Sequence, residues 1–105
     1  MQLKPGVRLL GLRPELVVAL IVADEIWRRH GADLVVTAVI DGVHKRASEH
    51  YSGCAADLRV HGVENLAEAV DELQDALGGD FDVILESANT PNAHVHLEFQ
   101  PKLAY

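Results

Sequence analysis

Two short segments of this sequence concentrate side chains that could bind a metal ion. The first carries His50 and Asp57, seven positions apart, with a glycine and two alanines between them. The second is His94-Val95-His96. If the second segment is a strand, His94 and His96 share one face with Glu98, because side chains two apart on a strand point the same way.

These residue types fit the ligand count of a catalytic zinc site. Such a site usually has three protein ligands drawn from His, Asp, Glu and Cys, and one open position. A zinc ion lowers the pKa of its water to about 7 and polarises a carbonyl, so the chemistry to expect is hydrolysis. The spacing alone leaves two alternatives open: paired surface histidines without a metal, and another divalent ion in the same ligands.

The same segments resemble the zinc D-Ala-D-Ala metallopeptidases and their relatives, a group that includes lysostaphin-type enzymes and the hedgehog signalling domain. The first match is DGVHKRASEHYSGCAADLRV (residues 41–60), close to the family form S-x-H-x-x-G-x-A-x-D. The second match combines DVILES (residues 82–87) with HVHLEF (residues 94–99). With the intervening helix and the preceding strand, the matched blocks cover about residues 34–101.

The resemblance implies a role for each residue that matches the family pattern. The implied ligands of a Zn²⁺ cofactor are His50, Asp57 and His96. His94 would lie beside the metal and steady a developing oxyanion, and Glu86 is the first candidate for the general base. Glu98 is the rival acid, although the family usually places a structural glutamate at that position.

Four further residues have supporting roles implied by the resemblance. Ser48 would orient the ligands, as surrounding hydrogen bonds do in metal sites, and His44 would line the cleft. Arg46 and Arg59 could hold a substrate carboxylate or be plain surface charges, so cleavage at chain ends or within chains stays open. His94 follows Glu86 by eight positions, more than in the relatives. The loop at 87–93 could therefore carry Glu86 away from the metal or form a lip of the substrate site.

Composition narrows the class of protein and its partners. The 105 residues suit one domain spanning 1–105, and a net charge of -7 argues against affinity for nucleic acid or an anionic membrane. The lone cysteine, Cys54, cannot form an internal disulfide and is expected to be a small buried residue. The longest apolar run, residues 16–23, is too short to span a bilayer. We expect a chain made in the cytoplasm without a signal peptide, and a phage or virion protein is the context this favours for action on the cell wall.

The pattern of apolar residues predicts helices and strands in mixed order. A helix is expected from Pro14 to about His30, apolar nearly all round and therefore well buried, after an irregular lead-in over residues 1–12. A second helix should end at Gly78 and Gly79 after an apolar stripe at helical spacing. Strands are expected at 34–40, 54–60, 81–86 and 94–99. This order predicts an α+β fold, a small and mainly antiparallel sheet with packed helices, and the resemblance implies the hedgehog/D-Ala-D-Ala peptidase arrangement.

Three hypotheses for function follow. The leading one is a zinc-dependent peptidase that hydrolyses D-amino-acid-containing peptide bonds of bacterial peptidoglycan. The alternative is a catalytically inactive, zinc-stabilised binding module or virion structural module, because the hedgehog domain keeps the fold without turnover. The third is a domain that binds no metal, whose thermal midpoint a chelator would leave unchanged.

Overall fold

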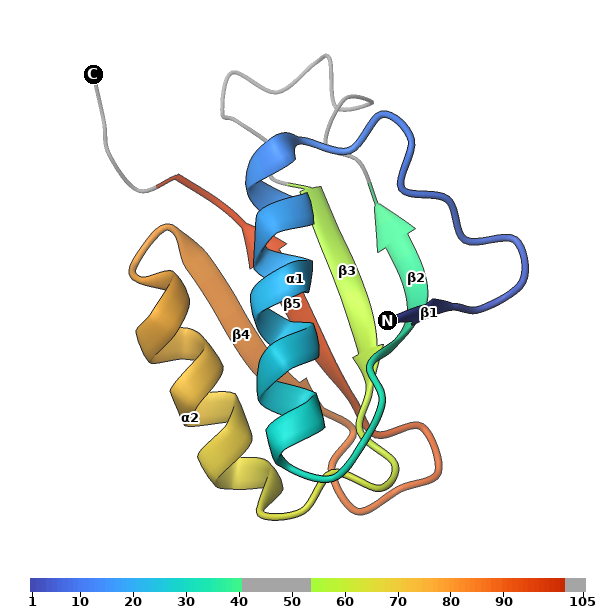
Figure 1. The fold of residues 1–105 in the computed structure, drawn as a ribbon, viewed down its shortest axis with the longest axis vertical. Coiled ribbons are helices and arrows are strands. Elements are labelled where there is room, and N and C mark those ends of the chain that lie inside the picture. Colours follow the sequence, from blue (N-terminus) through green and yellow to red (C-terminus); the bar gives the residue numbers. More distant parts are fainter. Residues whose placement is uncertain (41–53, 102–105) are drawn as a thin grey trace.

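One five-stranded sheet, covered on one face by two helices, makes up the part of the chain that the structure describes (Figure 1). The structure is a computed structural model, and it describes residues 1–40 and 54–101. In chain order the elements are β1 (Gln2–Leu3), α1 (Pro14–Arg29), β2 (Val35–Ile40), β3 (Cys54–Arg59), α2 (Leu66–Leu77), β4 (Phe81–Glu86) and β5 (His94–Phe99). None of the helices in these ranges is long and apolar enough to cross a membrane.

The strands are ordered β1-β2-β3-β5-β4 across the sheet. The β1–β2 pair is parallel, and the other three pairs are antiparallel. The predicted α+β class and the mainly antiparallel sheet are therefore confirmed. In this order β5 lies between β3 and β4, so its outward side chains have neighbours on both sides.

The predicted elements agree with the structure to within about a residue at each end, apart from the lead-in. There the expectation of wholly irregular backbone was wrong, because Gln2–Leu3 pairs with Val35 and Val36 of β2. The backbone N–H of Gln2 donates to the carbonyl of Leu34 at 2.8 Å. A strand of two residues is too short to show an alternating pattern in the sequence. It forms here because β2 supplies its hydrogen-bond partners.

The core lies between α1, α2 and the inner face of the sheet. On β5 the inward residues are Val95, Leu97 and Phe99, so His94, His96 and Glu98 share the opposite face, as predicted for a strand. Burial of each inward side chain contributes roughly 1.5–3 kcal/mol. The indole Nε1–H of Trp27 on α1 donates to the carbonyl of Arg59 at 2.9 Å, which fixes the end of β3 beneath the helix.

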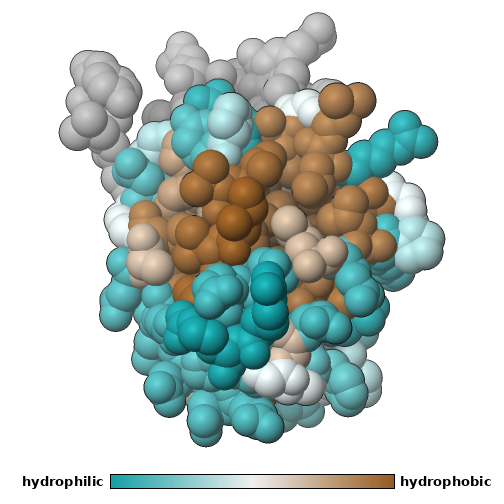
Figure 2. Space-filling model, viewed as in Figure 1, coloured by the Kyte–Doolittle hydropathy of each residue, from teal (hydrophilic) through white to brown (hydrophobic). Residues whose placement is uncertain are grey.

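Among residues 1–40 and 54–101, no helix or strand covers the outward side of α1. The prediction that this helix is well buried is confirmed for its inner side, where Leu16 and Leu20 are fully buried, but it is wrong for Val18 and Ile21, which are 58% and 57% exposed. The reason is that the sheet covers only one side of α1, and α2 lies beside it rather than over it (Figure 1). Figure 2 shows the resulting apolar surface gathered over the upper half of this helix face.

Candidate metal centre

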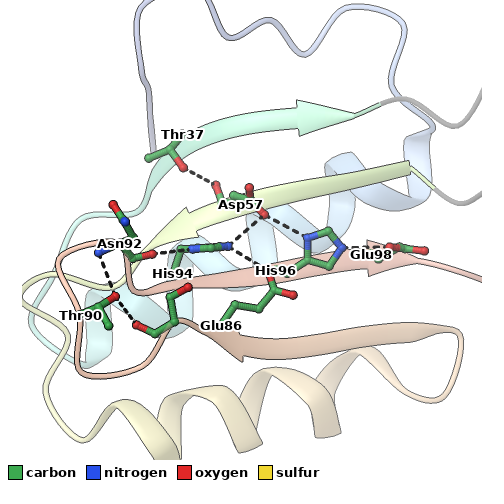
Figure 3. Close-up of polar contacts among 9 residues, drawn as sticks. Thr37, Asp57, Glu86, Thr90, Asn92, His94, His96 and Glu98 are labelled. Carbon is green, nitrogen blue, oxygen red and sulfur yellow. Dashed lines mark hydrogen bonds and ion pairs between the residues drawn. The ribbon is translucent and has the colours of Figure 1, made fainter.

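The candidate site lies on the face of the sheet opposite the helices, where three strands bring its residues together. Residues paired across antiparallel strands project to the same side. Asp57 of β3 is opposite His96 of β5, and Glu86 of β4 is opposite His94 of β5. Figure 3 shows these side chains pointing toward one another above the sheet. The pairing of the strands thus joins two segments that lie 39 positions apart in the sequence.

The closest contact between two predicted ligands joins Asp57 and His96. The ring Nδ1 of His96 is 3.0 Å from Oδ1 of Asp57, and it donates a hydrogen bond because a carboxylate only accepts. Two donor atoms bound to one tetrahedral zinc ion, at roughly 2.0–2.1 Å each, stand about 3.3 Å apart. The atoms that share a proton here therefore have nearly the separation needed to share a metal ion, and this pair fits the group that the resemblance implies.

The other ring nitrogen of His96 also has a carboxylate partner. Nε2 of His96 is 2.9 Å from Oε1 of Glu98. Histidines that bind metals commonly donate the second ring N–H to a carboxylate, which fixes the ring orientation. The contact suits Glu98 to a supporting role behind His96, which is the role implied by the resemblance, rather than to the role of general base.

His94 is held at both ring nitrogens. Nδ1–H donates to the carbonyl of Asn92 at 2.7 Å, and Nε2 is 3.0 Å from Oε1 of Glu86. The same Nε2 atom is 3.9 Å from Oδ1 of Asp57. His94 therefore lies between the proposed base and a proposed metal ligand, with its ring plane fixed by the backbone of the neighbouring loop.

The loop at 87–93 does not carry Glu86 away from the other site residues. Thr90 closes the loop: its hydroxyl donates to the carbonyl of Ser87 at 2.6 Å and accepts from the backbone N–H of Asn92 at 3.2 Å. The chain then returns to β5 in a register that places Glu86 directly opposite His94. The possibility that the loop carries Glu86 away is therefore excluded, and a role of the loop as a lip of the substrate site stays a prediction.

Both histidines hold their protons more tightly than a free imidazole. The carbonyl of Asn92 raises the pKa of His94, with a further contribution from its hydrogen bond to Glu86 and from the charge of Asp57. Burial opposes the charged form of His96, but the hydrogen bonds to Glu98 and Asp57 outweigh it and raise its pKa. A metal ion must displace a proton from His96, so metal binding is expected to release protons and to strengthen as the pH rises.

Several predicted residues lie outside the described part of the chain. These are the ligand His50 and the supporting residues His44, Arg46 and Ser48. Within residues 1–40 and 54–101, no group of three or more His, Cys, Asp and Glu side chains is arranged to hold a metal ion. Asp57 and His96 thus form a two-ligand arrangement there, and the third ligand stays a prediction.

Two contacts of the site had no signal in the sequence. The hydroxyl of Thr37, at an irregularity in the pairing of β2, donates to the backbone carbonyl of Asp57 at 3.3 Å. Asn92 acts on His94 through its carbonyl rather than its side chain. Sequence patterns reveal side-chain types, whereas these contacts use backbone atoms, which every residue has. Cys54 is fully buried in the core, as expected of a small buried residue, and burial raises the pKa of its thiol.

Comparison of the chain with protein-family models, with curated proteins and with solved structures found no match.

Proposed function

We propose that this chain is a zinc-dependent peptidase of the D-Ala-D-Ala metallopeptidase and hedgehog-like group, and that it hydrolyses peptide bonds next to D-amino acids in peptidoglycan. The observation that carries the proposal is the cross-strand contact of Asp57 with His96 at 3.0 Å, with Glu98 behind the imidazole. The order of the two sequence segments, which resembles that of the family, supports the choice of substrate.

The zinc ion would be held by Asp57 and His96 together with His50. When bound, it supplies Lewis acidity, which lowers the pKa of a water molecule and polarises a carbonyl group. Glu98 keeps the ring of His96 in the orientation that presents Nδ1, rather than Nε2, toward Asp57. This preorganisation reduces the conformational change needed on binding the metal.

Glu86 and His94 would handle the proton and the charge. The carboxylate of Glu86 accepts the proton of the attacking water and later gives it to the leaving amine. Nε2–H of His94 donates a hydrogen bond to the substrate oxygen as it gains negative charge. Oε1 of Glu86 and Nε2 of His94 are 3.0 Å apart, so both side chains can act on the same carbonyl group of the substrate. Once Glu86 has taken up the proton of the water, its neutral carboxyl group binds Nε2–H of His94 less strongly. Nε2–H of His94 is then free to donate to the oxyanion as it forms.

The test of this proposal is cleavage of purified peptidoglycan, with fragments identified by mass spectrometry. We expect cleavage with zinc present, loss of cleavage with a chelator, and recovery when zinc is added back. Fragment masses would identify the bond and decide between cleavage at chain ends and within chains. A protein that binds one zinc ion and cleaves nothing would contradict the peptidase and favour the inactive binding or virion structural module.

Substitution of Glu86 separates catalysis from metal binding. In Glu86→Gln, we expect the cleavage rate to fall by about 10²–10⁴-fold, because the amide cannot accept the proton. Zinc content should not change, since Glu86 is not among the proposed ligands. Glu68→Gln, which removes an exposed acid on α2, is the matched control and should cleave at the wild-type rate. Wild-type cleavage by Glu86→Gln would exclude Glu86 as the base.

A further inference from the structure

Strand β4 forms one edge of the sheet. It ends the strand order, and β5 is its one strand partner among residues 1–40 and 54–101. An edge strand carries a row of backbone N–H and C=O groups that can pair with a strand of another chain. Proteins commonly close such edges with charged side chains, with bulges, or with a helix or loop that covers them. How this chain closes the edge at β4 is therefore a question about its association with other chains.

The side chain of Gln74 occupies part of this edge. Gln74 lies on α2, which runs beside β4 (Figure 1). Its Nε2–H donates to the backbone carbonyl of Phe81 at 2.8 Å, and its Oε1 accepts from the backbone N–H of Val83 at 3.1 Å. Nε2 also donates to the carbonyl of Gly78 at 3.1 Å, at the end of the same helix. The carboxamide thus binds the backbone of β4 through both its nitrogen and its oxygen.

The two groups that Gln74 binds are those that a sixth strand would use. In a parallel pair, a residue of the added strand donates its N–H to the carbonyl of the residue before its partner. It accepts from the N–H of the residue after that partner. Around Asp82, these groups are the carbonyl of Phe81 and the N–H of Val83. The carboxamide of Gln74 therefore takes the place of a residue of an added strand.

The sequence of β4 favours pairing with another strand wherever its edge is open. Its residues, FDVILE, include Phe81, Val83 and Ile84, which are types that favour strands. Ile84 is 49% exposed, so part of this apolar strand reaches solvent. Asp82 and Glu86 flank Ile84 on the same face of the strand. Short apolar segments of this kind on an open edge are common sites of self-association.

We propose that Gln74 keeps copies of this chain apart, because its carboxamide occupies the edge against which β4 of a second copy would otherwise pair. A second copy fits this edge because two identical edge strands can pair antiparallel about a two-fold axis. Such a pair places the apolar residues Phe81, Val83 and Leu85 of one copy beside those of the other. This role of Gln74 does not depend on whether the chain binds zinc.

Removal of the carboxamide tests this role. In Gln74→Ala, sedimentation velocity should show dimers or larger species that increase with protein concentration and exceed those of the wild type. Alanine has the highest helix propensity, so α2 should persist, and circular dichroism checks that it does. Asp71→Ala, which removes an exposed side chain of the same helix, is the matched control and should sediment like the wild type.

Two further measurements identify the associating surface. At concentrations where Gln74→Ala is monomeric, the N–H of Val83 should exchange with solvent about tenfold faster than in the wild type, because its acceptor is lost. In Gln74→Ala/Ile84→Glu, association should be suppressed. Pairing of two β4 strands would then place the new glutamate opposite an acidic residue of the other copy, and like charges across a strand pair are destabilising.

Gln74→Met is the second variant, for the case in which Gln74→Ala does not fold. Methionine keeps the length of the side chain and its helix propensity but cannot donate to the carbonyl of Phe81, so the same association is expected. The role is overturned if the folded variants sediment like the wild type, or if Ile84→Glu leaves the association of Gln74→Ala unchanged. Loss of the fold in both variants would assign Gln74 to the fold itself and would also overturn the role.

Discussion

His96 is the residue on which the proposed metal site depends, because its two ring nitrogens face two different carboxylates. The carboxylates of Asp57 and Glu98 accept hydrogen bonds from the ring, and against the opposing effect of burial these two hydrogen bonds raise the pKa of His96. Exchange of the Nδ1 proton for a metal ion would keep the contact to Asp57 and leave Glu98 in place. The acids around His96 thus hold its ring in the orientation that the proposed zinc site would use.

Removal of the Glu98 charge should weaken zinc binding without abolishing it. In Glu98→Gln, we expect zinc affinity to fall about 10–100-fold, the usual effect of losing a partner behind a metal-binding histidine. Competition with a chromophoric chelator measures the affinity, and Glu68→Gln serves as the control for loss of one negative charge. Unchanged affinity in Glu98→Gln would contradict the supporting role.

The sequence predicted the residue types of the site but not their contacts. Alternation along β5 placed His94 and His96 on one face, and the structure agrees. The contact of Asp57 with His96 depends on the register between β3 and β5, which is set by packing over long sequence separation. The contact of Glu86 with His94 depends in the same way on how the loop at 87–93 closes.

Among the elements, α1 and α2 are joined at one end by His30, which the sequence indicated only as the approximate end of the first helix. His30 is 9% exposed, and its Nδ1–H donates to the carbonyl of Glu64 at 2.8 Å. Its Nε2–H donates to Oε1 of Glu72 at 3.2 Å, and Arg29 also bonds to that carboxylate. The end of α1 is thus tied both to the turn before α2 and to α2 itself.

These contacts predict a pH dependence of stability. The carbonyl of Glu64, then Glu72 and the more distant charge of Glu68, raise the pKa of His30 above its ordinary value of 6.5. The contribution of His30 is therefore complete below about pH 6.5 and is lost as the pH rises through the raised pKa. Arg29 and then His30 lower the pKa of Glu72 below 4.5, so its contribution is lost only as the pH falls through that lowered value.

In His30→Gln, the loss of thermal midpoint relative to wild type should be largest at about pH 5–6 and should shrink as the pH rises toward about 9. Thermal unfolding followed by circular dichroism across this range measures the difference. His61→Gln, at an exposed position in a turn, should show no comparable trend. A difference that stays constant with pH would mean that His30 contributes by packing and not by charge.

The extent of the elements was predictable because each long element has its own apolar period and its own stop signals. Gly78, with φ +83, ends α2 as expected of a residue without a side chain. The strand order was not predictable, since β5 lies between β3 and β4 through pairing that no local pattern encodes. Exposure of Val18 and Ile21 was missed for the same reason: an apolar helix does not reveal how many of its sides will be covered.

At the scale of the whole molecule, the two faces of the sheet have different tasks. One face packs against the helices and forms the core, while the other presents acids and histidines from β3, β4 and β5 (Figures 1 and 3). A domain of 105 residues buries a modest share of its surface, so its stability is limited. Zinc that binds only the folded chain would add stability, about 2.7 kcal/mol at a free concentration one hundred times Kd.

The central claim is that Asp57 and His96 bind zinc. The measurement that tests it most directly is a calorimetric titration with zinc of the wild type and of the variants Asp57→Asn and His96→Gln. We predict one zinc ion per wild-type chain, with binding weakened by about a hundredfold or more in each variant. His61→Gln should bind like the wild type. A wild-type chain that binds no zinc, or variants that bind zinc as tightly as the wild type, would contradict the assignment of Asp57 and His96 as ligands.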